Sequence, residues 1–269
     1  MKAYRADKRL GQHFLFDPSI LGRIAAAAGP LQDRTVLEVG PGPGGLTRAL
    51  LAAGPALLVA IDADARSIEA LRPLEAEAAG RLQLVHGDAL AFDPGGVAPA
   101  GGLIAVANLP YNVGTEILLR WLHRLERFDR FVLMFQREVA LRLAAAPGSA
   151  DYGRLAVLAQ TLCRVERLFD LPPGAFVPPP KVWSSVVRLV PRPDRPDAAA
   201  TALLEAVTRA AFGQRRKMLR ASLATLVPDP LALLAAAGID PQRRPETLTL
   251  VEFAALASAL GDVRRSGSP

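Results

Sequence analysis

The stretch T-V-L-E-V-G-P-G-P-G-G, residues 35–45, predicts how this chain begins its fold. Residues 35–39 form a short apolar run with several β-branched side chains, which is typical of a buried strand. The glycine-rich residues after it lead into a segment from Leu46 that predicts a helix. A buried strand that runs through a glycine loop into a helix is the first half of a nucleotide-binding βα unit.

The glycines of this loop fit more than one nucleotide cofactor. Gly40, Gly42 and Gly45 satisfy G-x-G-x-x-G, so the loop alone does not separate a dinucleotide from S-adenosylmethionine. Glu38 stands two residues before the first of these glycines. A carboxylate near the loop would repel a pyrophosphate and tolerate the ammonium of an amino acid. We therefore expect S-adenosylmethionine, and the alternative of a nicotinamide-dependent oxidoreductase is disfavoured.

Further apolar runs predict strands whose ends carry polar or small side chains. The runs at residues 57–61, 82–86 and 103–106 are followed by Asp62, by Asp88 and Ala89, and by Asn108. The carboxyl ends of parallel strands meet at one edge of a sheet, so these side chains outline a ligand crevice there. We expect Asp62 to accept ribose hydroxyls and Asp88 to accept from an adenine amine. Asp64 is expected to cap the next helix instead.

The turn A-N-L-P-Y-N-V-G, residues 107–114, holds the only two asparagines of the chain. An asparagine amide offers one acceptor and two donors in a plane, and Pro110 restricts the backbone so that the Asn108 and Leu109 carbonyls are aimed. Tyr111 adds an aromatic plate. This arrangement suits a flat ligand with an exocyclic amine, such as a nucleobase taken out of its stack. The alternative is a turn in which an asparagine caps the helix that follows.

Composition limits the possible partners. The 269 residues are 51% hydrophobic and 22% charged, and their net charge of +6 favours a polyanionic partner. The longest apolar candidate, residues 50–61, is interrupted by Gly54-Pro55 and is too short to span a membrane. One cysteine, Cys163, excludes an intramolecular disulfide, and the three histidines lack metal-site spacing. We expect a monomeric, cytoplasmic protein with no metal and no membrane partner.

An N-terminal arm precedes the first helix. Residues 1–9 are basic, and Asp17 followed by a proline predicts the N-cap and first position of a helix. Between them, Gln12 and His13 are candidates to lie over a bound ligand. The alternative is an arm that is simply packed onto the protein by its two phenylalanines.

The rest of the chain predicts the end of the sheet and a separate helical part. Helices are expected at residues 114–125 and 136–145, and strands at residues 131–135, 162–169 and 182–190. The last two strands would close the sheet with an antiparallel edge. We predict an α/β fold, a Rossmann-like and mostly parallel sheet over residues 1–190 including the arm at 1–17. A linker at 191–197 and an all-α domain at 198–269 follow.

Two segments are candidates to contact nucleic acid. The loop at residues 172–182 contains five prolines and presents Phe176 and Lys181 on a stiff backbone; Phe176 is either a base-stacking plate or a hydrophobic plug. Residues 211–223 are predicted to be helical and carry a dense basic cluster, which is more typical of a phosphate contact than of a solvated face. The cluster consists of Arg215, Arg216, Lys217 and Arg220.

Several motifs together resemble the adenine dimethyltransferases of ribosomal RNA. They are E-V-G-P-G-P-G-G-L-T, the G-D after the third strand, N-L-P-Y-N, F-V-P-P-P-K-V and F-G-Q-R-R-K, and the resemblance covers about residues 10–260. Within the family, G-Q-H-F-L, R-R-K and R-R-P-E-T-L are most similar to the members that modify two adjacent adenines near the 3′ end of small-subunit RNA. Relatives that act on large-subunit RNA in antibiotic resistance, and an RNA-binding assembly factor without turnover, are the alternatives.

The resemblance implies a cofactor, a substrate and roles for individual residues. It implies S-adenosylmethionine, ribosomal RNA or an immature small subunit as partner, and a role in ribosome biogenesis. It implies that Asn108 and Leu109 hold the target amine, while Tyr111 and Phe176 stack on the base. The cofactor contacts it implies are His13, Leu15, Gly40, Asp62, Asp88 and Asn108.

Three positions depart from the pattern that is usual in this family. His13 stands where Asn is usual, and Asp62 stands where Glu is usual. Both keep hydrogen-bonding capacity, so the expectation of cofactor binding is retained. Trp183 stands where Asp is usual, which removes a polar group from that position.

Overall fold

The computed structural model describes residues 11–97, 102–214 and 216–266. The described residues form two compact units, each presented by itself below. The first takes in residues of Met1–Ala140 and Glu166–Pro191, and the second takes in residues of Leu141–Val165 and Arg192–Pro269.

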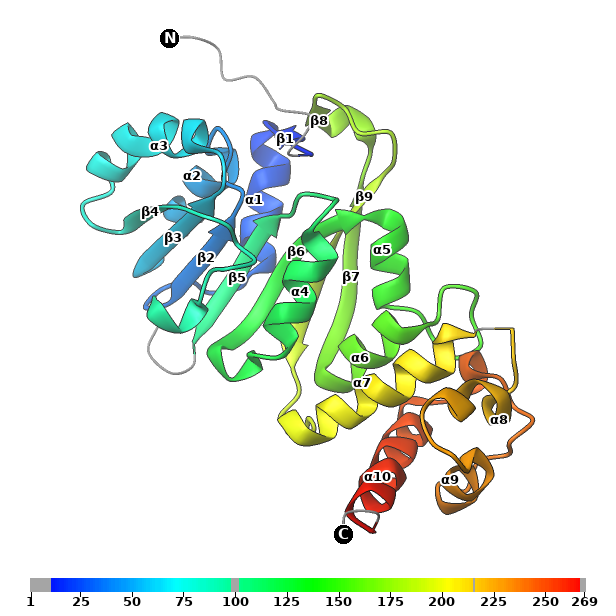
Figure 1. Ribbon diagram of the computed structural model, residues 1–269. Helices are drawn as coiled ribbons and strands as arrows, with labels where there is room; N and C mark the ends of the chain where they lie inside the picture. The colour runs from blue at the N-terminus through cyan, green and yellow to red at the C-terminus, as the bar shows by residue number, and fades with distance from the viewer. Residues whose placement is uncertain (1–10, 98–101, 215, 267–269) are drawn as a thin grey trace. The chain divides into compact units, whose positions relative to one another are not determined.

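The first unit is built on a mostly parallel sheet with the strand order β4-β3-β2-β5-β6-β9-β7 (Figure 1). The strands are β2 (Thr35–Val39), β3 (Leu57–Asp62), β4 (Leu82–His86), β5 (Leu103–Asn108), β6 (Phe128–Gln136), β7 (Cys163–Leu171) and β9 (Ser184–Pro191). The pairs from β4 to β6 are parallel, whereas β9 runs antiparallel to β6. The predicted α/β class is confirmed.

The central strands are apolar because helices cover both faces of a parallel sheet. Val36 in β2 and Ile104 in β5 have no exposed surface. Continuous apolar runs, rather than alternating ones, are what such doubly covered strands require.

The register of these strands creates the ligand edge that the sequence predicts. Val39, the last residue of β2, pairs with Ile61 on one side and with Ala107 on the other. The residues that follow each strand therefore emerge together, and Asp62 and Asn108 flank the glycine loop.

Helices of the first unit begin at side chains that the sequence predicts as caps. Asp17 accepts a hydrogen bond from the Ser19 amide at 2.8 Å, and Asp64 accepts one from the Arg66 amide at 3.0 Å. Both caps are thus confirmed, and each satisfies amides that the first helical turn leaves unpaired. The helices are α1 (Pro18–Ala27), α2 (Gly45–Ala52), α3 (Ala65–Glu77), α4 (Gly114–Leu122) and α5 (Arg137–Leu143).

A small second sheet ties the end of the N-terminal arm to the proline-rich loop. Strand β1 (Phe14–Leu15) pairs antiparallel with β8 (Phe176–Val177), and both strands lie near the top of Figure 1. This pairing places the arm against the sheet's ligand edge. The basic residues 1–9 lie outside the described residues.

The second unit is helical and larger than predicted. Its helices are α6 (Arg154–Leu162), α7 (Ala198–Gly213), α8 (Leu219–Ser222), α9 (Pro230–Ala236) and α10 (Leu250–Ser266). The sequence analysis assigned residues 141–165 to the first domain, but they group with the C-terminal helices because α6 packs against α7 and α10. Short 3-10 turns over both units occur at Pro94–Gly96, Leu125–Arg127, Pro173–Ala175, Leu223–Thr225 and Pro245–Thr247.

The basic cluster does not lie on a continuous helix, contrary to the prediction. Helix α7 ends at Gly213, and Arg216 and Lys217 lie in the turn before α8, which carries Arg220. A glycine is a poor helix residue and favours termination there. Arg215 lies outside the described residues.

Over the described ranges, no single helix has the length and apolarity to cross a membrane; only the sharply bent pair Leu219–Thr225 and Pro230–Ala236 satisfies both conditions jointly. Histidine, cysteine and acidic side chains form no metal-ligating group of three among those same residues.

Candidate functional site

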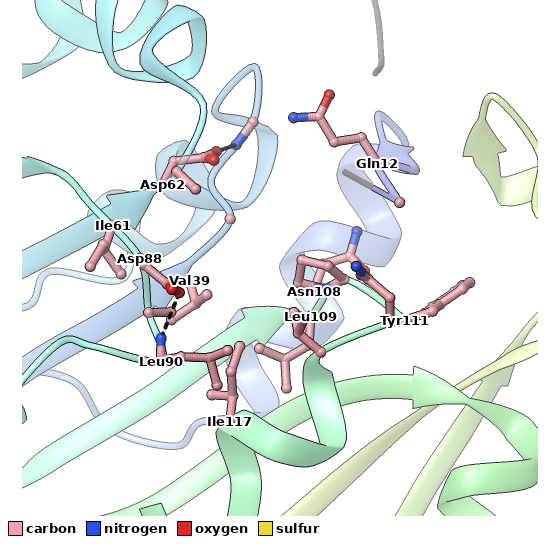
Figure 2. A pocket seen from close by; sticks show the side chains of 18 of the residues that line it. Gln12, Val39, Ile61, Asp62, Asp88, Leu90, Asn108, Leu109, Tyr111 and Ile117 are labelled. Carbon is pink, nitrogen blue, oxygen red and sulfur yellow. Dashed lines mark hydrogen bonds between the residues drawn. The ribbon is translucent and has the colours of Figure 1, made fainter. Parts of the chain in front are cut away.

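A cavity of about 270 Å³ opens at the carboxyl ends of the parallel strands in the first unit (Figure 2). The turn after β5 faces the carboxylates after β3 and β4 across it, and the arm forms part of its wall. Most of the residues predicted for the site line it together. They are Gln12, His13, Gly40, Gly42, Asp62, Asp88, Ala89, Asn108, Leu109, Pro110 and Tyr111.

The glycine loop shapes this cavity and accepts the arm. Gly40 and Gly42 have φ values of +71° and +51°, which favour glycine. A Cβ on Gly42 would lie 2.5 Å from the Phe14 ring, so the arm packs where a side chain would stand. A Cβ on Gly40 would lie 3.7 Å from the Asn108 carbonyl oxygen. The backbone is therefore bare on the side where a ligand approaches.

Asp62 is a buried acceptor at the mouth of the loop. Its oxygens accept from the Asp64 amide at 2.9 Å and the Gly42 amide at 3.4 Å. Burial raises the pKa of Asp62, and these backbone hydrogen bonds partly oppose the shift. Because each carboxylate oxygen has more than one lone pair, the group can also accept from vicinal hydroxyls in the cavity.

Asp88 and a set of apolar side chains form the opposite end of the cavity. Asp88 is anchored because its Oδ1 accepts from the Leu90 amide at 2.9 Å. Figure 2 shows this carboxylate among aliphatic side chains, an arrangement that fits a flat heterocycle with one exocyclic amine. The aliphatic residues are Val39, Ile61, Leu90 and Ile117.

Glu38 lies beneath the loop rather than in the cavity. It is 1% exposed, and it borders a separate hollow of about 20 Å³ together with Gly40 and Asn108. Burial raises the pKa of Glu38 to about 8, and the charge of Asp62 adds to this effect. The carboxyl is therefore mostly neutral at pH 7, which corrects the view of Glu38 as a carboxylate that faces the cofactor.

The side chain of Asn108 is oriented by the arm. Its Nδ2 donates to the His13 carbonyl oxygen at 2.8 Å. Because a carbonyl oxygen can only accept, this contact requires the amide nitrogen and leaves Oδ1 as the acceptor. Helix α4 begins after Val113 without a side-chain cap, so the capping alternative for this asparagine is wrong.

The ring of His13 joins three segments of the site. Its Nδ1 lies 2.7 Å from the Pro178 carbonyl oxygen of the proline-rich loop. The ring also stacks on Tyr111, with centroids 5.5 Å apart and an interplanar angle of 27°. Next to it, Gln12 donates to the Asp64 carboxylate at 3.0 Å. The arm is thus bound to the loop, the turn and the start of α3.

Some predicted site residues lie elsewhere. Leu15 and Phe176 are 6% and 2% exposed and belong to the hydrophobic core, so in this structure Phe176 is the plug and not the base-stacking plate. The reason is the β1–β8 ladder, in which these two residues pair. Lys181 is exposed on the loop and does not line the cavity. The residues that sequence reasoning missed are Ser184, which contacts the Tyr111 hydroxyl, and Pro178.

The cavity suits S-adenosylmethionine in shape and chemistry. The bare glycine backbone, an acceptor for hydroxyls at Asp62 and an acceptor for an amine at Asp88 match the amino-acid, ribose and adenine parts of that molecule. The Asn108 acceptor then lies where the reactive end would meet a substrate.

Known proteins with similar sequences share nearly the whole chain. Residues 3–260 match the family model described as ribosomal RNA adenine dimethylase. Ribosomal RNA small subunit methyltransferase A of Bradyrhizobium diazoefficiens is 52% identical over 268 residues, which cover 98% of this chain and 94% of that protein. The protein of the same name from Rhodospirillum rubrum is 54% identical over 255 residues, covering 95% and 88%.

Solved structures agree with this assignment. A dimethyladenosine transferase from Plasmodium falciparum superposes with a TM-score of 0.78 at 26% identity, covering 95% of this chain and 98% of its own. The 23S rRNA methyltransferase ErmE superposes with a TM-score of 0.69 at 26% identity, covering 92% and 99%. This chain belongs to the ribosomal RNA adenine dimethylase family and is an S-adenosylmethionine-dependent methyltransferase.

Proposed function

We propose that this protein dimethylates the N6 atoms of two adjacent adenosines near the 3′ end of small-subunit ribosomal RNA, as a step in small-subunit biogenesis. The observation that carries the proposal is the cavity in which the Asn108 and Leu109 acceptors face a cofactor-shaped space. Identity above 50% to two proteins named for the small subunit favours that RNA over large-subunit RNA.

We assign the cofactor-binding roles from the geometry of the cavity. Asp62 accepts from the ribose hydroxyls, Asp88 accepts from the adenine amine, and the backbone at Gly40 and Gly42 contacts the amino-acid portion. Gln12 and His13 cover the site from the arm. When bound, S-adenosylmethionine supplies a methyl group that is electrophilic because it is attached to a positively charged sulfur.

The substrate amine is held by two acceptors. Asn108 Oδ1 and the Leu109 carbonyl oxygen accept its two hydrogens, which turns the nitrogen lone pair toward the methyl carbon. A bond forms from nitrogen to carbon as the bond from carbon to sulfur breaks, and the nitrogen then releases a proton to water. Positioning supplies most of the rate, so no residue has to remove a proton before attack.

Tyr111 is the aromatic plate in this proposal. Its ring borders the cavity, and its plane is held by His13 on one face and by the Ser184 contact at its hydroxyl. Pro110 keeps Leu109 extended so that its carbonyl points to the target. Phe176 can add a second plate only after it leaves its core position, so we assign the stacking to Tyr111.

We propose that the helical part of the chain, residues 198–269, binds the RNA backbone. Arg216, Lys217 and Arg220 are exposed in the second unit, and Lys181 is exposed in the first. Arginine and lysine that neutralise phosphates supply most of the affinity for nucleic acid. The protein would act as a monomer on immature small subunits, in the cytoplasm.

A transfer assay tests the proposed function. Purified protein is incubated with S-adenosylmethionine that carries a labelled methyl group and with small or large ribosomal subunits from cells that lack the corresponding methylation. We expect label in dimethyladenosine at two adjacent positions of small-subunit RNA, identified by mass spectrometry. Label only in large-subunit RNA would support the antibiotic-resistance activity instead. Binding of RNA without any label would support an assembly factor.

A further inference from the structure

Trp183 is a large aromatic side chain that remains exposed on the first unit. It is 48% exposed, whereas the only other tryptophan, Trp121, is 3% exposed and packs on Phe128 and Phe131. An exposed indole exchanges little water for protein contact on folding, so its place is better explained by what it binds than by stability.

The backbone that carries Trp183 is held firmly. Its carbonyl oxygen accepts from the Arg137 amide at 2.8 Å, at the junction of β6 and α5. The next residue, Ser184, begins β9 and pairs with Gln136. A plate presented from an ordered backbone loses little conformational freedom when a ligand binds to it.

The surroundings of Trp183 are positively charged. Lys181 is exposed two residues earlier, and the Arg137 side chain is 52% exposed. Arg137 and Arg167 share one carboxylate, Asp170, at 3.3 Å and 2.7 Å, so these groups keep a net positive charge. An aromatic face among cations is the composition of surfaces that bind unpaired nucleic acid, where the cations follow the phosphates and the ring stacks on a base.

Trp183 is also connected directly to the reaction cavity. Ser184, its neighbour in the chain, is hydrogen-bonded to the hydroxyl of Tyr111, which lines the cavity. The Cα atoms of Trp183 and Ser184 are separated by a single peptide link, about 3.8 Å. Trp183 therefore stands within reach of the nucleotides on either side of a target base at Tyr111.

We propose that Trp183 is a second stacking platform, which holds an unpaired nucleobase adjacent to the target adenosine. The inference rests on the proposed RNA substrate and adds a residue that binds it. Extruding the target base unstacks its neighbours, and a stack on Trp183 would offset part of that cost. The same contact would favour substrates in which the neighbour of the target is unpaired.

Steady-state kinetics with matched variants separates stacking from general apolar contact. Trp183→Phe keeps an aromatic plate, Trp183→Leu keeps apolar bulk without one, and Trp183→Ala removes both. Val190→Ala is the control, since Val190 is 38% exposed at the other end of β9. The substrate is the undermethylated small subunit, and the cofactor is saturating.

We expect Trp183→Ala and Trp183→Leu to raise KM for the RNA by roughly 5- to 150-fold, the range that one lost base stack produces, with kcat changed less than about threefold. Trp183→Phe should recover most of the loss, and Val190→Ala should match the wild type. A Trp183→Leu variant that matches Trp183→Phe would overturn the proposal, because an apolar surface for a protein partner would then suffice.

Tryptophan fluorescence tests the same contact directly. Because Trp121 is the only tryptophan left in Trp183→Phe, subtracting that variant's signal isolates Trp183. The probes are a short single-stranded RNA with two adjacent adenosines and the same RNA in a duplex. We expect the single strand to quench Trp183 and to shield it from acrylamide, and the duplex to do neither. Unchanged emission in a preparation that methylates small subunits would overturn the stacking site while leaving the proposed function intact; a preparation that methylates nothing would overturn the function itself.

Discussion

The hydroxyl of Tyr111 is hydrogen-bonded to the Oγ of Ser184, which joins the turn after β5 to the first residue of β9. Ser184 has no exposed surface, and burial raises the pKa of Tyr111. The hydroxyl therefore stays neutral at physiological pH and is available as a partner for Ser184. Together with the His13 stack, this bond restricts both the position and the plane of the tyrosine ring.

The first prediction separates the ring of Tyr111 from its hydroxyl. Tyr111→Phe keeps the plate but leaves the buried Ser184 Oγ without this partner, so it should lower the free energy of unfolding by about 1–3 kcal/mol and keep activity close to wild type. Tyr111→Ala removes a stack worth about 1–3 kcal/mol and should be far less active. Turnover and thermal melts measure the two effects. Should Tyr111→Phe fold normally and lose as much turnover as Tyr111→Ala, the hydroxyl would be the essential group.

The second prediction concerns the two carboxylates of the cofactor cavity. Asp62→Ala and Asp88→Ala should each weaken S-adenosylmethionine binding by about 1–3 kcal/mol, because donors of the cofactor lose their acceptors. Asp62→Ala should also destabilise the glycine loop, since the Gly42 and Asp64 amides lose a partner. Calorimetric titration measures the affinity. Unchanged affinity in both variants would remove these residues from the site.

The sequence predicts this ligand edge well because each contribution to it is local. A strand, a glycine loop and an acceptor directly after a strand are encoded within about ten residues, and parallel pairing then brings the strand ends together. Asp62, Asp88 and Asn108 were found in this way. The orientation of Asn108 depends instead on the His13 carbonyl, which is 95 residues away.

The errors have a common physical origin in long-range pairing. Phe176 looks like an exposed plate in a proline-rich loop, but its pairing with Leu15 in the β1–β8 ladder places it in the core. Ser184 is 73 residues from Tyr111, and no local pattern marks their contact. The end of α7 at Gly213 could have been anticipated from glycine's low helix propensity.

The third prediction uses the buried carboxyl of Glu38. Folding raises the pKa of this group from 4.5 to about 8, so between these values the unfolded chain has released a proton that the folded chain retains. Its contribution to the free energy of unfolding therefore falls as pH rises from 4.5 to about 8. Glu38→Gln, which is neutral throughout, should lose this pH dependence. Thermal melts over that range test it, and parallel curves for the two proteins would show that Glu38 ionises normally.

The fourth prediction concerns the basic residues between α7 and α8. Reversing the charges of Arg216, Lys217 and Arg220 should weaken RNA binding and flatten its dependence on salt by about 0.7 per lost contact to a single strand, with cofactor affinity unchanged. Arg72→Glu is the control, because Arg72 is an exposed arginine that forms an ion pair with Glu75 on α3. A salt slope equal to that of the wild type would identify the cluster as a solvated surface.

The last prediction separates the two functions of the Asn108 amide. Asn108→Ala removes an aimed acceptor and should lower turnover by roughly 10²–10³, as for other single groups that stabilise a transition state. RNA affinity should persist, because phosphate contacts supply most of it.

Asn108→Asp is the sharper variant, since it keeps an acceptor at Oδ1 but replaces the donor to the His13 carbonyl with a second acceptor. Two acceptors cannot share a hydrogen bond without a proton between them, so the arm should separate from the turn and turnover should fall nearly as far as in Asn108→Ala. Asn112→Ala is the matched control, because Asn112 is exposed in the same turn. Turnover and RNA affinity are measured for all three variants. If Asn108→Asp retains wild-type turnover, the acceptor alone is sufficient and the contact with the arm has no part in positioning the amide.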